Sequence, residues 1–592
     1  MCTAKHVILR TQVKILLGKH LKGEMVQIIQ ICRLEGMATI KTLILASLLF
    51  WHFPMNMVLA NSGSYLAGQF AEKEGDFRNA SYYYIDLISR GETEREIIKR
   101  SIIYSALSGN FEVATAISRK IEDLELNYPI ANLIIFAEAI KNKENHKIVE
   151  EFERNKNLFP AIFRNVAEFW ILIINNEKDK AFRLLNSLSI NNEAQMQIIN
   201  YNQLLAYVYF NEYEQAKTLY ENLDFSDFLF DSDSALALLK YFQKYKESKE
   251  SKVFKSILNK VRSASNNSYY ILALMDELSS GEEINSIRID PYKQIAEVFL
   301  RWSQSVQIQG KNGINKPFYL SLANYADPTS SFLKFKTATV LSDTENYGLS
   351  KEILDNFSKE DVFYMDSIVE RTFAIEQQDN DESALEYIEK FISDGFKNAR
   401  LLKTYGSLQR SQRLYNEAIK SYTGAIEEAK REQYTEAIWP ILFLRGISFE
   451  RSKNWNLAEA DFISALELSP NQPQILNYMG YSLLERKEKL DQAMRMILMA
   501  AEKSPDSYHI IDSLGWAYYK TGNFEKALLY LERAMELEST DPIVNDHLGD
   551  VLWMLGRKRE AKFQWKKSLS FKPEPVDQKK TEDKLAFGLN KR

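Results

Sequence analysis

Apolar residues recur along most of this chain at the spacing of amphipathic helices, and short polar breaks divide these helices into antiparallel pairs. The pattern is most regular between Leu476 and Pro573, where three segments align with a step of about 34 residues. Small residues share columns in this alignment, and each segment ends at a proline or serine. The columns are Gly480, Gly515 and Gly549; Ala493, Ala527 and Ala561; Ala500, Ala534 and Ser568; and Pro505, Ser539 and Pro573. The pattern predicts a tandem array of helical hairpins.

Each kind of column has a physical reason. Glycine and alanine allow the two helices of one hairpin to approach closely where they cross. Proline ends the second helix because it lacks an amide hydrogen and disfavours helix in the residue before it. Larger apolar residues are expected to fill the space between neighbouring hairpins: Leu514, Tyr518, Leu531, Leu548, Leu552 and Trp565.

This period and column order resemble the tetratricopeptide repeat. The resemblance implies an all-α fold, a right-handed superhelix of stacked hairpins (an α-solenoid). The columns recur elsewhere, so we expect an N-terminal array over residues 61–223 and a C-terminal array over residues 361–573. The recurrence is carried by Gly68, Ala80, Ala114, Ala181 and Ala216 in the first array, and by Ala384, Gly406, Ala418, Gly446, Ala458, Ala465 and Pro470 in the second.

Between the arrays, residues 224–360 keep a helical periodicity but lose the phase of the columns. Two interpretations stay open for this section. It forms degenerate helical repeats that keep the superhelix running, or it forms a hinge or a platform for a partner. After Pro573, residues 574–592 form a polar tail that we expect to be frayed.

The segment Met37–Ala60 has the features of a secretory signal peptide. Lys41 supplies the positive start, an apolar stretch runs from Thr42 to Phe53, and small residues precede Asn61. We therefore expect cleavage after Ala60 and a periplasmic product. An uncleaved inner-membrane anchor is the alternative, because the segment approaches the ~20 residues that span a bilayer.

Residues 1–36 form a basic and apolar leader, which is either an extension of the signal or lies upstream of a true start at Met37; we favour the second. Both cysteines, Cys2 and Cys32, lie in this leader. A chain that begins at Asn61 therefore contains none, which excludes disulfide, thiolate–metal and cysteine-nucleophile chemistry. It also has no cysteine to carry a lipid at the cleavage site.

The charge and the remaining motifs give no sign of catalysis. The net charge of −5 provides no basic field for nucleic acid. After Ala60 the histidines are His146, His509 and His547; we expect His509 and His547 to be surface or capping residues because no further ligands stand at metal-binding spacing around them. No phosphate-binding glycine loop and no nucleophile elbow occurs. We predict no enzyme, no metal and no cofactor; an unrecognised site in residues 224–360 is the alternative.

The resemblance also predicts which side chains face the concave groove, because the inner helix of each hairpin points its second, fifth, ninth and twelfth residues there. Carboxylates and aromatic rings share these positions, and unpaired carboxylates are rarely buried. We therefore expect an acidic and aromatic groove that prefers basic or apolar segments of other proteins. For Trp516 and Trp553, packing between hairpins is the alternative. The groove-facing residues are Asn477, Tyr481, His509, Asp512, Trp516, Tyr519, Ile543, Asp546, Asp550 and Trp553.

The stretches LNYMGYSLLERKEKLDQAM, IIDSLGWAYYKTGNFEKAL and VNDHLGDVLWMLGRKREAKFQW resemble exported repeat proteins of proteobacteria. That group includes lipoprotein adaptors that hold a periplasmic carboxyl-terminal processing protease and deliver cell-wall hydrolases to it. The resemblance implies a non-catalytic adaptor or assembly factor in the cell envelope. A cytoplasmic co-chaperone is the alternative. Members of that class clamp a carboxylate terminus with Lys, Asn and Arg, whereas this chain has Asn477, Asp512 and Asp546 at the equivalent positions.

Overall fold

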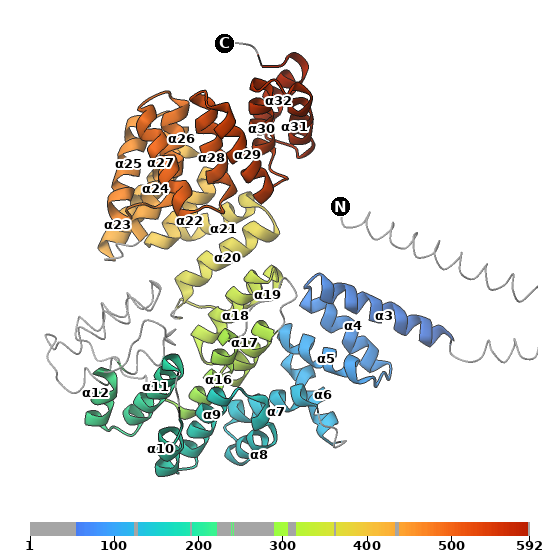
Figure 1. Cartoon of the computed structure of the whole chain (residues 1–592). Helices are drawn as coiled ribbons and strands as arrows, with labels where there is room; N and C mark the ends of the chain where they lie inside the picture. Colours follow the sequence, from blue (N-terminus) through green and yellow to red (C-terminus); the bar gives the residue numbers. More distant parts are fainter. Residues whose placement is uncertain are drawn as a thin grey trace, which may run out of the picture. The chain divides into compact units, whose positions relative to one another are not determined.

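The computed structural model describes residues 55–123, 128–189, 192–221, 289–305, 315–359, 361, 363–432 and 437–589, with residues 238 and 241. Every regular element in these ranges is a helix (Figure 1). The leader 1–36 and residues 37–54 of the predicted signal peptide lie outside the described residues. The chain divides into two compact units, Met1–Ser105 and Ala106–Arg592.

The first unit contains helices α3 (Met55–Lys73), α4 (Phe77–Ser89) and most of α5 (Arg95–Leu107). The ring of Tyr84 lies buried at its centre, stacked on Tyr104 with 5.8 Å between ring centroids. A Cβ added to Gly68 would approach the Tyr84 ring to 3.2 Å, so the close crossing predicted at this column is confirmed. Within this unit, Arg100 of α5 forms an ion pair of 2.5 Å with Glu72 of α3.

The second unit begins with hairpins whose order follows the sequence. Its first helices are α6 (Phe111–Asp123), α7 (Pro129–Asn142), α8 (Asn145–Asn155), the 3-10 turn η1 (Lys156–Leu158), α9 (Ala161–Ile174), α10 (Lys178–Asn186), α11 (Glu193–Tyr209) and α12 (Tyr213–Glu221). The described chain then resumes with α16 (Pro291–Ser305), α17 (Asn315–Ala326), α18 (Ser331–Asp343) and α19 (Tyr347–Leu354).

The C-terminal array consists of paired helices in which the even-numbered member is the inner helix. The pairs are α20 (Tyr364–Gln378) with α21 (Asp381–Ser393), α22 (Ala399–Ser411) with α23 (Tyr415–Arg431), α24 (Ile438–Arg451) with α25 (Trp455–Leu468), α26 (Pro473–Glu485) with α27 (Leu490–Lys503), α28 (Tyr508–Lys520) with α29 (Phe524–Leu537), and α30 (Pro542–Met554) with α31 (Lys558–Ser570). A final helix, α32 (Pro575–Phe587), packs against α31.

The glycine and alanine columns lie where the helices of each pair cross, as predicted. A Cβ added to Gly515 would lie 2.6 Å from Cγ of Leu531, and one added to Gly549 would lie 2.5 Å from Cδ1 of Trp565. Ala527 and Ala561 are completely buried at the same crossings. The columns are therefore a steric requirement of the hairpin.

The change Gly515→Ala is expected to destabilise the chain by about 1–2 kcal/mol, because overpacking outweighs the gain in helix propensity. Chemical denaturation of the two proteins measures this difference. Gly424→Ala is the matched control, since a Cβ there would meet only Cδ1 of Leu402 at an ordinary 3.4 Å. That control should be neutral or slightly stabilising; equal losses in both variants would contradict the steric explanation.

The expectation of a frayed tail is wrong. Residues 575–587 form helix α32, which begins with Pro575 at its first turn. Thr581 in this helix is buried, and Lys584 pairs with carboxylates of α30. The sequence of the tail is mostly polar because a helix with one covered face needs few apolar residues.

Candidate functional site

Helix α16 of the same chain covers the inner faces of α7 and α9. Counted from the small-residue columns, Phe163 and Val166 of α9 and Ile198 and Tyr201 of α11 are groove-facing positions. These four side chains face Val298 and its neighbours on α16 across a cavity of only about 20 Å³. Helix α16 also packs against α7, and α17 packs against α7 as well (Figure 1). This part of the groove is therefore filled.

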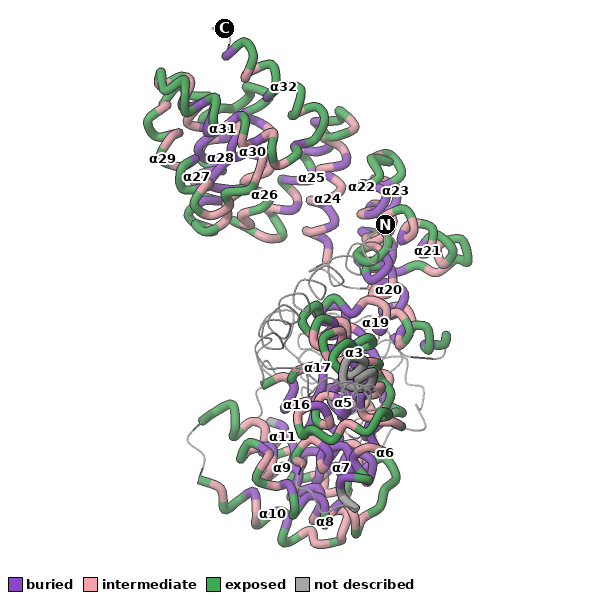
Figure 2. Tube along the Cα trace, turned by 90° about the vertical axis from the view of Figure 1, so that its right-hand side faces the viewer, coloured by how far each residue is buried: buried purple, intermediate pink, exposed green. Residues whose placement is uncertain are grey.

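Aromatic contacts form the centre of this packing. The completely buried ring of Phe299 on α16 lies 6.0 Å from the ring of Phe136 and 6.0 Å from that of Phe159. On α17, Tyr325 stacks face to face on Phe111 at 4.1 Å. Buried residues accordingly gather on α7, α9 and α16 (Figure 2). The surface that would hold a partner in an open array is here part of the core.

Polar contacts at the edge of this packing join segments that lie far apart in the sequence. Lys143 pairs with Asp290 at 2.8 Å, and the Tyr292 hydroxyl donates to Oδ1 of Asn145 at 2.5 Å. Neither interpretation of residues 224–360, degenerate repeats or hinge, predicts that their described helices cover the earlier array. Most of residues 224–288 lie outside the described ranges.

In the C-terminal array, the structure pairs Asp512 with a residue of the next hairpin. Nδ1 of His547 lies 3.0 Å from both carboxylate oxygens of Asp512, and both side chains are buried. Burial lowers the pKa of His547, but the charge and hydrogen bond of Asp512, with Asp546 and Asp550 nearby, outweigh it, so the net pKa is raised. The expectation that His547 lies at the surface is wrong; His509 is exposed as predicted.

Trp516 is held in a stack of aromatic rings. Its indole lies 3.9 Å from the His547 ring and 4.6 Å from the Tyr519 ring, nearly parallel to both. Its Nε1 donates to Glu485 at 2.7 Å, and Lys520 pairs with the same carboxylate at 3.0 Å. The structure therefore places Trp516 between hairpins, as the alternative interpretation has it.

Helix α32 covers the groove-facing side of α30. Lys584 pairs with Asp546 at 2.5 Å and with Asp550 at 2.8 Å, and Asp550 also accepts from Nε1 of Trp565 at 3.0 Å. Burial raises the pKa of Asp550, and the charge of Lys584 opposes that shift. These two carboxylates are therefore neutralised within the chain.

At the end of α32, the chain also covers Trp553. A Cβ added to Gly588 would come within 2.2 Å of this indole. Ile543 lies half-buried at the start of α30.

Two of the residues predicted to face the groove, Asn477 and Tyr481, lie on α26. Oδ1 of Asn477 is buried without a hydrogen-bond partner among the described residues. One turn further, Tyr481 is half-buried, and burial together with the charges of Glu485 and Asp512 raises the pKa of its phenol. Phe443 on α24 is the fifth residue of its repeat, which is a groove-facing position, and it is half-buried. An unsatisfied acceptor next to aromatic and apolar surface suits the backbone N–H of a bound segment.

Glu432 holds the start of helix α22. Its carboxylate accepts from the backbone N–H of Ala399 at 3.2 Å. Burial raises the pKa of Glu432 to about 7, and the neighbouring charge of Glu428 adds to this shift. Because the folded pKa lies above the unfolded value, ionisation costs stability as the pH rises from about 4.5 to about 7, and the full cost remains above that.

Glu432→Gln is therefore expected to raise the free energy of unfolding above pH 7, by about 1–2 kcal/mol once solvent screening is allowed for. The glutamine oxygen can still accept from Ala399, so the local hydrogen bond is kept. Denaturation curves at pH 4 and pH 8 measure the effect, and the two proteins should converge at pH 4. A constant difference at both values would rule out the titration of this group.

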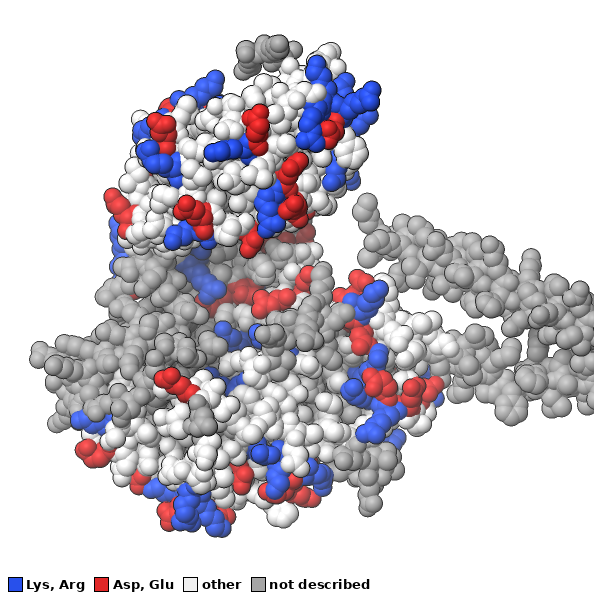
Figure 3. Space-filling model, viewed as in Figure 1, with Lys and Arg blue, Asp and Glu red and all other residues white. Residues whose placement is uncertain are grey.

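The described residues contain no group of three or more His, Cys, Asp or Glu side chains that could hold a metal ion. No helix in the described ranges is long and apolar enough to cross a membrane. On the face shown in Figure 3, basic and acidic side chains are interspersed and form no broad field of one sign.

Comparison with known proteins agrees with the hairpin geometry. Residues 511–541 match the family model "Tetratricopeptide repeat". The TPR repeat-containing protein PA4667 of Pseudomonas aeruginosa is 32% identical over 126 residues, which are 21% of this chain and 21% of that protein. Anaphase-promoting complex subunit CDC16 of Saccharomyces cerevisiae is 28% identical over 140 residues, 23% of this chain and 16% of that protein. The chain thus spans less than a quarter of these curated relatives.

Among solved structures, the APC/C hetero-tetramer Cut9–Hcn1 covers 90% of this chain with 14% identity and a TM-score of 0.38; 96% of that chain is covered. The family match falls on helices α28 and α29, within the segment where the columns are most regular. The predicted all-α fold of tetratricopeptide hairpins is confirmed.

Proposed function

We propose that this tetratricopeptide repeat protein is a non-catalytic scaffold that holds a segment of another protein in the groove of its C-terminal array. The observation that carries the proposal is the pair Asn477 and Tyr481 on α26, where Oδ1 of Asn477 has no hydrogen-bond partner among the described residues. Their groups face a groove whose other predicted side chains are mostly occupied within the chain. Helix α16 covers the inner faces of α7 and α9, so the proposal places the bound segment in the C-terminal array.

The preference for a basic partner loses its support, because Asp512, Asp546 and Asp550 are all paired within the chain. The preference for apolar segments keeps its support from Phe443, Tyr481 and neighbouring half-buried rings. Aromatic anchors of this kind supply much of the affinity of protein interfaces.

The proposed setting is the cell envelope of a bacterium, with the signal peptide removed after Ala60 and the product in the periplasm. The signal-like segment, the absence of cysteine from Asn61 onward and the resemblance to exported repeat proteins support it. Within that setting, delivering substrates to a periplasmic protease, or supporting peptidoglycan maintenance, is the role that the resemblance favours.

The test is cross-linking and co-purification of the full chain with a C-terminal tag, with the N-terminus sequenced in the same sample. We expect a start at Asn61 and an enriched protease or wall hydrolase. Asn477→Ala combined with Tyr481→Ala should reduce the captured partner about tenfold. Leu529→Ala, on the exposed side of α29, is the control and should change nothing.

Capture that is unaffected by the double substitution, with helicity preserved, would reject the groove as the binding surface. An intact leader with cytosolic chaperones enriched would instead favour the co-chaperone alternative.

A further inference from the structure

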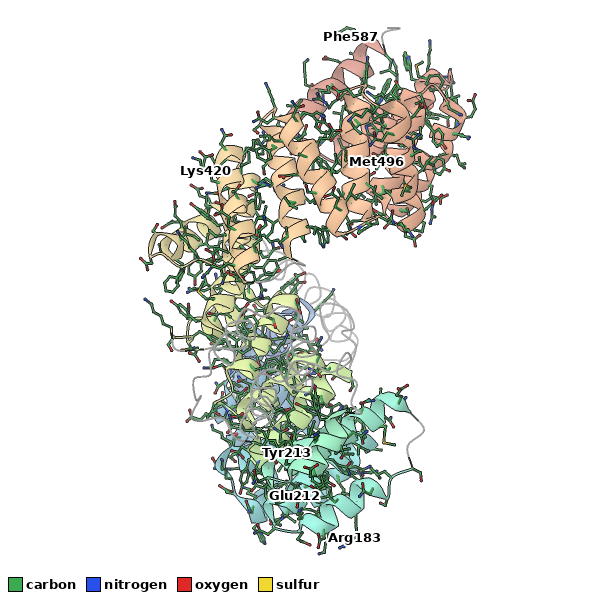
Figure 4. The ribbon with its side chains drawn as sticks, turned by 90° about the vertical axis from the view of Figure 1, so that its left-hand side faces the viewer. Arg183, Glu212, Tyr213, Lys420, Met496 and Phe587 are labelled. Carbon is green, nitrogen blue, oxygen red and sulfur yellow. The ribbon has the colours of Figure 1, made fainter. Side chains whose placement is uncertain are left out.

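His547 lies buried within a group of charged side chains, here called the His547 cluster, to which α26, α28, α30 and α32 contribute. The cluster consists of the carboxylates of Glu485, Asp512, Asp546 and Asp550 and the cations of Lys520, His547 and Lys584. We propose that the proton on His547 holds these helices together and that its loss at higher pH loosens them. Figure 4 shows Phe587, the last residue of α32, at the end of the array.

His547 joins two successive inner helices through its contact with Asp512. Its Nδ1 lies 3.0 Å from each oxygen of that carboxylate, and both side chains are buried. A protonated imidazole forms a charged pair with Asp512, whereas a neutral imidazole offers only a hydrogen bond. Because a buried carboxylate without a counter-ion is costly, the proton stabilises the contact between α28 and α30.

The indole of Trp516 adds a second interaction that depends on the same proton. The His547 ring lies 3.9 Å from the indole and is nearly parallel to it. A cation over the face of a tryptophan is attracted by the ring, so the stack favours the charged imidazole over the neutral one. Nε1 of Trp516 donates to Glu485, which extends the connected contacts to α26.

The charges around His547 come from several helices. Asp512 of α28, Asp546 and Asp550 of its own helix α30, and Glu485 of α26 act on it; Lys520 of α28 pairs with Glu485, and Lys584 of α32 pairs with Asp546 and Asp550. Burial lowers the pKa of His547, but the charge and hydrogen bond of Asp512, with the charges of Asp546 and Asp550, outweigh it and raise the pKa above the ordinary 6.5.

The stability that this proton supplies is lost in one direction of pH. Because the folded pKa of His547 lies above the unfolded value, the contribution is fully present below pH 6.5 and disappears as the pH rises through the folded pKa. Burial raises the pKa of Asp550 to about 6, although Lys584 opposes the shift, so Asp550 titrates on the acidic side. Burial also raises the pKa of the phenols of Tyr481 and Tyr519, which stay neutral in this range.

The inference goes beyond the proposed function and holds for the chain without a partner. Trp516 and Tyr519 are groove-facing residues by the repeat count, and their rings stack on each other at 4.6 Å. Since Trp516 also stacks on His547, loss of the proton weakens the support of this aromatic surface. The last hairpins of the array therefore contain a joint that is firm at neutral pH and looser at alkaline pH.

Hydrogen exchange of the full chain at about pH 6.5 and about pH 9, corrected for the pH dependence of the intrinsic rates, tests the proposal. The protection of α28 and α30 should fall about tenfold between the two values, the factor that corresponds to one pKa unit. The protection of α24, which carries no residue of the cluster, should stay constant.

His547→Gln keeps an N–H group that can donate to Asp512 and removes the titration. Its protection of α28 and α30 should already be low at about pH 6.5 and should not fall further. His509→Gln is the matched control, because His509 lies exposed on α28 and belongs to no part of the cluster. Its pH profile should equal that of the unaltered chain.

NMR of the full chain with isotope-labelled histidine measures the titration directly, and His547→Gln identifies the signal. We expect a midpoint above pH 6.5 for His547. Asp512→Asn keeps an oxygen that can accept from Nδ1 but removes the charge, so the midpoint should fall by at least about one pH unit. A residue that only fills space at this position would show no such shift.

Equal protection of α28 and α30 at both pH values would overturn the proposal, and so would an equal fall in the unaltered chain and in His547→Gln. A midpoint for His547 at or below pH 6.5, or one that Asp512→Asn leaves unchanged, would also overturn it. If His547→Gln does not fold, exchange in the unaltered chain and the midpoint shift in Asp512→Asn decide the question.

Discussion

Replacing Lys584 with methionine is expected to destabilise the C-terminal hairpins by about 3–5 kcal/mol. The change leaves the carboxylates of Asp546 and Asp550 close together and without their counter-ion. Both are mostly buried, so water cannot replace the ammonium without opening the contact between α30 and α32. Methionine keeps most of the length and apolar surface of the lysine, which limits the loss to the charge.

Chemical denaturation monitored by tryptophan fluorescence, to which Trp553 and Trp565 contribute, measures this effect. Lys580→Met, on the exposed side of the same helix, removes an ion pair with Asp577 and should cost less than about 1 kcal/mol. The deficit of Lys584→Met should shrink as the pH falls, because protonation of the unpaired carboxylates removes their repulsion. A deficit that does not depend on pH would show that α32 is held by packing.

The second large effect is expected for Phe299→Ala, which should cost about 3–5 kcal/mol. Phe299 fills the space between Phe136 and Phe159, so its removal leaves a cavity between α16 and the earlier hairpins. Phe373→Ala is the control, since this ring is 40% exposed on α20 and should cost much less.

Hydrogen exchange adds a local measurement to the same variant. The amides of α7 should exchange faster in Phe299→Ala, because this helix depends on α16 and α17 for cover. Unchanged protection of α7 would mean that the earlier hairpins are stable by themselves and that α16 packs against them without stabilising them.

The hairpins could be predicted from the sequence because their requirements are local and repeated. Gly515 packs closely against Leu531 within one repeat, and Gly549 packs in the same way against Trp565 one repeat later. The state of the groove carboxylates was harder to predict, because each is paired by a residue about one repeat further along. The sequence did hold a signal for Lys584, which follows Asp550 by 34 residues and thus occupies the ninth position of a further inner helix.

The filled groove had a signal as well. All eight residues from Leu133 to Ile140 on α7 are buried, and this run is apolar except for Glu138. A helix that is apolar on every side is covered on every side. The sequence could indicate that α7 is enclosed, but not which segment encloses it, because that segment follows after a long stretch without repeat phase.

The return of α16 and α17 to the early hairpins also bears on how the chain is made. Lys143 and its partner Asp290 are 147 residues apart. At a synthesis rate of about 5–20 residues per second, roughly 7–30 seconds pass on the ribosome before α16 can reach α7. During that interval the apolar inner faces of α7 and α9 are uncovered. We expect a holding chaperone to protect the nascent chain at this stage, and a pause in translation before Pro291 to lengthen its exposure to aggregation.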